Sequence, residues 1–74
     1  MRYTAILTTP KGMREQKIFD VTGYPKELQG HVKKHPDIQA MRKIIDHQYG
    51  TGWAEGSQVI VTCNSDPKFK LELI

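Results

Sequence analysis

Hydrophobic and polar residues alternate along both ends of the chain. The segment RYTAILTT alternates and is rich in β-branched residues, which favours a β-strand. Pro10 and Gly12 then stand at turn spacing before EQKIFDV, so the beginning of the chain predicts a β-hairpin. QVIVTC and KFKLELI predict a second hairpin, because the NSDP between them is a strong turn signal.

Between the two hairpins the pattern becomes helical. Pro25 suits the first position of a helix, and KELQGHVKKH follows it. A proline disfavours helical geometry in the residue before it, so we expect this helix to end or bend at His35. Pro36 then opens a second helix, for which Gly50 is a natural C-cap. The apolar stripe of the second helix consists of Ile38, Met41 and Ile45, with Ile44 at its edge.

These elements predict a ββααββ order in one small globular domain over residues 1–74. The expected fold class is α+β, with a four-stranded, mainly antiparallel sheet and helices packed on one face. Apolar residues make up 38% and charged residues 26% of the chain, which argues against disorder of the whole chain. Its apolar runs are too short for a signal peptide or a membrane span, so we expect neither.

Strand parity divides the expected sheet into two faces, because side chains alternate along a strand. Burying a large apolar side chain is worth roughly 1.5–3 kcal/mol, so the more apolar face should cover the core. Its members are Tyr3, Ala5, Leu7, Val59, Val61, Cys63, Phe69, Leu71 and Leu73. The other face, called the open face below, is polar and slightly basic, and no helix remains in the sequence to cover it.

The open face has two interpretations. A half-solvated antiparallel sheet normally carries such a mixture of side chains. Apolar residues inside a polar rim also mark surfaces that bind a partner protein or a second copy of the chain. In the second interpretation three isoleucines make the contacts, three basic residues steer an acidic partner, and the tryptophan lies at the rim. The partner-binding set is Ile6, Ile18, Ile60, Arg2, Arg14, Lys70 and Trp53.

Charge adds an alternative function. The chain has eleven basic and eight acidic residues, a net charge of +3, with the two signs interspersed. Basic residues of the two expected helices can bind nucleic acid, with Trp53 nearby for base stacking. The residues of this alternative are Lys33, Lys34, Arg42 and Lys43. A helix-turn-helix also needs a third helix in its core, whereas the remaining residues here form strands.

The segment GTGWAEG, residues 50–56, holds half of the glycines and the only tryptophan. A phosphate-binding loop follows a strand and precedes a helix, but here the order is inverted. We therefore interpret the segment as a helix stop and a connector. Trp53 then either folds over an open end of the core or serves as a binding anchor.

No group of residues predicts catalysis. Cys63 has inward parity in an apolar strand, where a buried thiol without a positive neighbour is inert. As the only cysteine it also fits a reducing, cytoplasmic setting. His31 and His35 lie four apart, but no spacing singles out a third metal ligand. We expect a non-catalytic interaction or regulatory protein without cofactor, metal or membrane contact, whose partner is a protein or a second copy.

Overall fold

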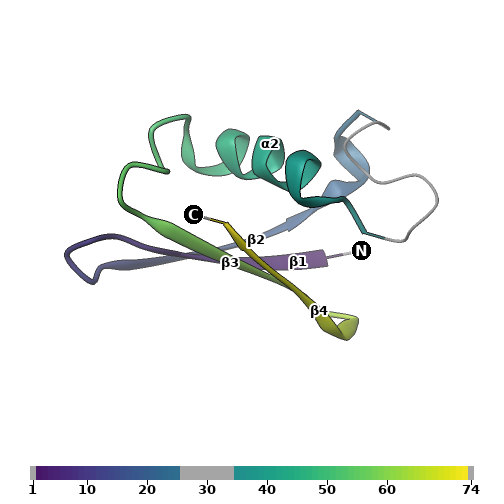
Figure 1. Ribbon diagram of the computed structural model, residues 1–74. Helices are drawn as coiled ribbons and strands as arrows, with labels where there is room; N and C mark the ends of the chain where they lie inside the picture. The colour runs from purple at the N-terminus through teal and green to yellow at the C-terminus, as the bar shows by residue number, and fades with distance from the viewer. Residues whose placement is uncertain (1, 26–34, 74) are drawn as a thin grey trace.

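The computed structural model describes residues 2–25 and 35–73 of the chain. Four strands form one antiparallel sheet in the order β2-β1-β3-β4, and a single α-helix crosses one of its faces (Figure 1). The α+β class and the antiparallel sheet are therefore confirmed. The elements are β1 (Arg2–Thr8), β2 (Arg14–Asp20), the 3-10 helix η1 (Val21–Gly23), α2 (Ile38–Tyr49), β3 (Gln58–Cys63) and β4 (Asp66–Leu73).

The expected ββααββ order is not matched. The described residues contain one α-helix, and their strands and helix follow the order ββαββ. Most of the expected first helix falls on residues 26–34, which lie outside the described residues. At its borders, Pro25 follows η1 and His35 lies in a bend, as expected for a residue that precedes a proline. Asp20 stabilises η1, because its carboxylate accepts a hydrogen bond from the Thr22 backbone N–H.

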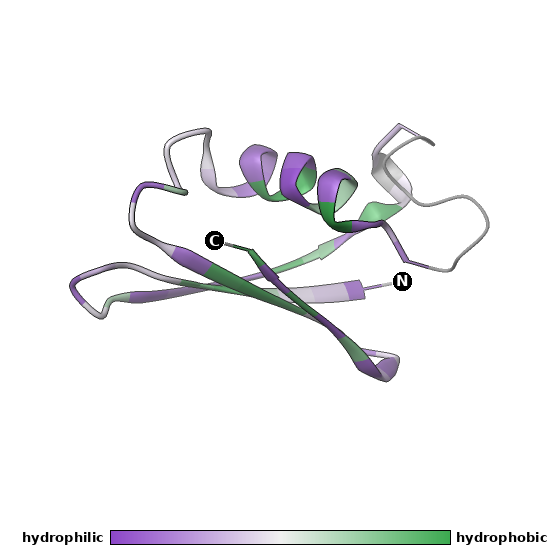
Figure 2. Ribbon diagram, in the orientation of Figure 1, coloured by the Kyte–Doolittle hydropathy of each residue, from purple (hydrophilic) through white to green (hydrophobic). Residues whose placement is uncertain are grey.

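The α2 helix begins one residue after Asp37 and ends at Gly50. The Asp37 carboxylate accepts a hydrogen bond from the Ala40 backbone N–H at 2.8 Å, which makes Asp37 the N-cap. Gly50 has φ 89° and donates its N–H to the Asp46 carbonyl oxygen, so the predicted C-cap is confirmed. Figure 2 shows hydrophilic residues on the side of α2 that faces away from the sheet.

The buried stripe of α2 differs from the predicted one at its N-terminal end. Ala40, Met41, Ile44 and Ile45 are buried, whereas Ile38 is 48% exposed. The prediction placed Ile38 within the stripe and Ile44 at its edge. Ile38 is the first residue of the helix, so no preceding turn holds its side chain against the core.

The two faces of the sheet follow the predicted parity. The buried residues of the core face are Tyr3, Ala5, Leu7, Val59, Val61, Cys63 and Leu73, and they pack with α2. Phe69 and Leu71 lie on the same side but are only partly buried, because β4 is an edge strand. The β3–β4 pairing shifts register between Thr62 and Cys63, next to the turn that joins the two strands.

The connector between α2 and β3 packs against the first hairpin. Gly56 has φ 71°, and a Cβ atom built on it would lie 2.9 Å from Cγ of Pro10. Trp53 is only 6% exposed and belongs to the core cluster, where its Nε1 donates a hydrogen bond to Asp46 Oδ1. The GTGWAEG segment is therefore a structural connector that closes one end of the core. No helix in the described part of the chain is long and apolar enough to span a bilayer.

Candidate protein-binding face

Three isoleucines form a diagonal stripe across the open face. The register sets Ile6 of β1 directly opposite Ile60 of β3. On the other side of β1, Ile18 of β2 stands opposite Thr4, one step along the same face from Ile6. Directly opposite side chains have Cβ atoms about 4.5–5.5 Å apart, and diagonal neighbours are still within reach of long side chains. The stripe therefore runs from β2 through β1 to β3.

The stripe is accessible to a partner. Ile18 is 56% exposed, while Ile6 and Ile60 are partly exposed between their strand neighbours. None of the described elements covers this side of the sheet, since α2 lies on the other side (Figure 1). Uncharged polar side chains surround the isoleucines: Thr4, Thr8, Gln16, Gln58 and Thr62. The face thus combines a small apolar centre with a polar surround, the anatomy of a protein-binding surface.

The charged residues lie at the borders of the open face. Arg2 and Arg14 are exposed, and Lys70 Nζ lies 3.5 Å from Glu72 Oε1 on β4. Asp20 stands opposite Arg2 in the register. A hydrogen bond from the Thr22 backbone N–H lowers the pKa of Asp20, so this carboxylate stays ionised well into acidic pH. Among these five residues, three are basic and two are acidic, an excess of one positive charge.

Trp53 is not part of this face, which corrects the sequence-based expectation. It lies in the core beneath the end of α2, and the Arg42 guanidinium carbon sits 5.8 Å from its ring centroid. A ring that is buried and covered in this way cannot stack on a base. The sequence did not reveal this because Asp46, which accepts the indole N–H, comes from another element.

The residues of the nucleic-acid alternative are only partly described. Lys33, Lys34 and also His31 lie outside the described residues. Lys43 is exposed on α2, whereas Arg42 is half-buried over the Trp53 ring. The described part of this set therefore provides one exposed lysine and no exposed tryptophan.

His35 is held by the protein on both ring nitrogens. The Tyr3 hydroxyl lies 2.8 Å from Nδ1, and Nε2 lies 2.8 Å from Oδ2 of Asp66. With a neutral imidazole, Tyr3 donates to Nδ1 and Nε2–H donates to Asp66, which satisfies all three groups. The ring also packs on Phe69 with centroids 4.2 Å apart. Burial, with smaller contributions from Cys63, Asp20 and Asp66, raises the pKa of Tyr3 to about 12.

His47 and Cys63 also have contacts within the fold. The Tyr24 hydroxyl lies 3.0 Å from Nδ1 of His47 and accepts a hydrogen bond from Gln48 Nε2 at 2.6 Å. Cys63 is buried, and its Sγ lies 3.5 Å from Oγ of Ser65. No group of three or more potential metal-ligating side chains occurs among the described residues. No local pattern predicted the histidine contacts, because their tyrosine partners are more than twenty residues away in the chain.

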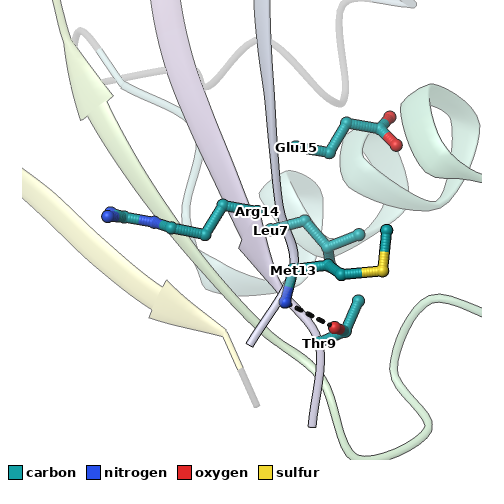
Figure 3. A pocket seen from close by; sticks show the side chains of 5 residues that line it. All are labelled: Leu7, Thr9, Met13, Arg14 and Glu15. Atoms are coloured by element: carbon teal, nitrogen blue, oxygen red, sulfur yellow. Dashed lines mark hydrogen bonds between the residues drawn. The ribbon is translucent and has the colours of Figure 1, made fainter. Parts of the chain in front are cut away.

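A hollow of about 170 Å³ lies beside the first hairpin (Figure 3). Leu7, Thr9, Met13, Arg14 and Glu15 line it, and Met13 is 69% exposed. The Met13 backbone N–H donates to Oγ1 of Thr9 at 3.0 Å, which tightens the turn. The volume is below the roughly 300–1,000 Å³ typical of small-molecule sites, so the hollow gives no basis for a cofactor or substrate site.

Comparisons with protein-family models, with curated proteins and with solved structures give no match.

Proposed function

We propose that this protein is a small, non-catalytic interaction protein that binds a partner protein through the open face of its sheet. The observation that carries the proposal is the pairing of Ile6 with Ile60 on a sheet surface that none of the described elements covers. The Ile18 side chain, 56% exposed, extends the apolar stripe toward the β2 edge.

Two further observations support binding over chemistry. His35 and Cys63 are the side chains best suited to act as an acid or base or as a nucleophile. Both are engaged in packing and hydrogen bonds within the fold. The open face itself has no histidine or cysteine in its described part, and its carboxylates stand on opposite edge strands. A regulatory or accessory role in the cytoplasm is part of the proposal, and the buried thiol of Cys63, the only cysteine of the chain, agrees with it.

Nucleic-acid binding is the alternative function. It would use Arg42 and Lys43 together with Lys33 and Lys34. The buried Trp53 removes its stacking residue, and the Arg42 guanidinium already lies over that ring. We therefore treat nucleic-acid binding as an outcome that the experiment must be able to detect.

The test is affinity capture from a lysate of the source organism with three forms of the protein. In I6T/I60T the stripe loses its centre, while β-branched side chains keep the strand preference. The matched control is I38T, which changes an isoleucine exposed on α2, away from the open face. Capture is run at low and high salt, with and without nuclease, because contacts to phosphates weaken steeply with salt.

We expect the wild type and I38T to recover the same protein under every condition, and I6T/I60T to recover at least about tenfold less. A tenfold loss corresponds to about 1.4 kcal/mol, which is within what two buried isoleucine contacts supply. Equal recovery by I6T/I60T and wild type would contradict the proposal. Recovery that disappears with nuclease or high salt would favour the nucleic-acid alternative.

A further inference from the structure

The two edges of the open face carry charges in opposite order. On β2 the face begins with Asp20 and ends with Arg14, and on β4 it begins with Lys68 and Lys70 and ends with Glu72. A row is defined here as the residues that stand opposite one another across the four strands. Lys70 of β4 is in the same row as Ile18 of β2, with Thr4 and Thr62 between them. Glu72 of β4 is in the same row as Gln16 of β2, with Ile6 and Ile60 between them.

Each charge of β2 therefore lies one row beyond an opposite charge on β4. Asp20 lies two residues beyond Ile18, at the end of the sheet where β4 carries Lys70. Arg14 lies two residues beyond Gln16, at the end where β4 carries Glu72. A surface with this pattern is complementary to itself after its edges are exchanged.

We propose that the protein bound by the open face is a second copy of the chain, packed face to face about a two-fold axis that runs parallel to the strands between β1 and β3. This inference rests on the proposed function. The rotation exchanges β2 with β4 and β1 with β3, while each row keeps its level. Asp20 then lies diagonally across from Lys70 of the second copy, one row away, and Arg14 lies diagonally across from Glu72 of the second copy, also one row away.

The apolar residues match under the same rotation. Ile6 faces Ile60 of the second copy, so four isoleucines meet at the centre of the interface. Ile18 stands in the row of Lys70 of the second copy, whose methylene groups cover it while the amine reaches Asp20. A two-fold axis across the strands also pairs opposite charges, but it sets Ile6 on Thr4 and Ile60 on Thr62. The apolar match therefore selects the axis parallel to the strands.

The ion pair that Lys70 forms within one copy does not oppose this pairing. Lys70 and Glu72 form an exposed ion pair at 3.5 Å, and such pairs contribute little because water solvates both charges. Replacing that ion pair by contacts with the second copy therefore costs little free energy.

The size of the face predicts a weak dimer. Four strands spaced about 4.8 Å apart, each about seven residues long with a rise of about 3.3 Å, give a surface of about 19 by 23 Å. Two copies then bury about 900 Å² in total, below the roughly 1,200–2,000 Å² of stable specific interfaces. We expect a dissociation constant in the micromolar range, so measurements should extend from about 5 to about 500 µM.

The test uses sedimentation equilibrium with two charge-reversal variants, R14E and E72R. These residues are exposed and cap no helix, so circular dichroism should show the native fold in both variants. A dimer of either variant contains two like-charge contacts, so we expect its dissociation constant to rise at least about tenfold. An equimolar mixture restores opposite charges at both contacts, and we expect heterodimers within about threefold of wild-type affinity, identified by native mass spectrometry. The I6T/I60T variant should lose association.

Three results would overturn the inference: a wild type that stays monomeric up to about 500 µM, single variants that associate as well as the wild type, or a mixture that does not recover. Association insensitive to the charge reversals would place the contact on another surface, such as an edge strand. A monomeric wild type would remove only the second copy as partner. The proposed function itself fails when I6T/I60T captures its partner as well as the wild type does.

Discussion

Replacing Tyr3 by phenylalanine removes one hydroxyl and leaves the packing of its ring in place. The ring is fully buried, stacks on Phe19 with centroids 5.8 Å apart and meets Phe69 edge-on at 5.4 Å. Tyr3→Phe therefore removes mainly the hydrogen bond to Nδ1 of His35, which leaves that nitrogen without its donor. We expect the free energy of unfolding at pH 7 to fall by about 1–2 kcal/mol.

The same substitution should reverse its effect at high pH. Burial raises the pKa of Tyr3 to about 12 in the folded chain, against 10.0 for an unperturbed tyrosine, so folding favours the protonated phenol. This stabilisation is complete below pH 10 and is lost as the pH rises toward 12. Two pH units correspond to about 2.7 kcal/mol, an order-of-magnitude figure. Because Tyr3→Phe has no such group, it should become the more stable form near pH 12.

Urea unfolding followed by the fluorescence of Trp53, the only tryptophan, measures both forms between pH 7 and pH 12. Titration of lysines and of the other tyrosines affects both forms alike and cancels in the difference. We expect the free energy of unfolding of the wild type to exceed that of Tyr3→Phe at pH 7. This difference should shrink above pH 10 and then change sign. A difference that stays constant from pH 8 to pH 12 would refute the reasoning about the buried hydroxyl.

Two further predictions concern the connector that closes the core. Gly56→Ala should lower the free energy of unfolding by about 1–3 kcal/mol, because Gly56 has positive φ and its new Cβ would meet Pro10. Gly52→Ala is the control and should change it by less than about 0.5 kcal/mol in the same thermal melts, since nothing lies within 4 Å of its Cβ position. Asp46→Ala should cost about 1–3 kcal/mol and shift the emission maximum of Trp53 to longer wavelength, because the indole N–H loses its acceptor. An unchanged spectrum and stability would show that this hydrogen bond is unimportant.

Strand parity was the part of the fold that the sequence could predict. Alternation in RYTAILTT and QVIVTC assigned Tyr3 and Val61 to the core and Ile6 and Ile60 to the open face, and burial confirms that assignment. It succeeds because one face of a half-covered sheet must bury apolar residues. Local capping signals also predicted the end of α2 at Gly50.

Contacts between distant elements were not predictable in this way. Composition and spacing left Trp53 as either core or binding anchor, and its place in the core depends on Asp46 and α2. His35 looked like a possible metal ligand together with His31, but its ring nitrogens contact Tyr3 and Asp66. Such contacts depend on strand register and helix placement, which no local pattern determines.

The same distinction applies to the open face. The sequence predicted which residues share it, because parity depends on one strand at a time. Whether the isoleucines are neighbours depends on how the strands align, and only the register shows that Ile6 stands opposite Ile60. The sequence-based set of charges was also incomplete, since it included Arg14 and Lys70 without the acidic residues that balance them. Asp20 and Glu72 become relevant once the rows of the face are known.

The measurement that tests the central claim most directly is methyl NMR of the isoleucine side chains. Isotope-labelled protein at low concentration is titrated first with unlabelled protein and then with a lysate of the source organism. Binding through the open face should shift or broaden the methyl signals of Ile6, Ile18 and Ile60, while Ile38 on α2 stays unchanged. Signals of the three open-face isoleucines that do not change in either titration, or that change no more than that of Ile38, would contradict the account.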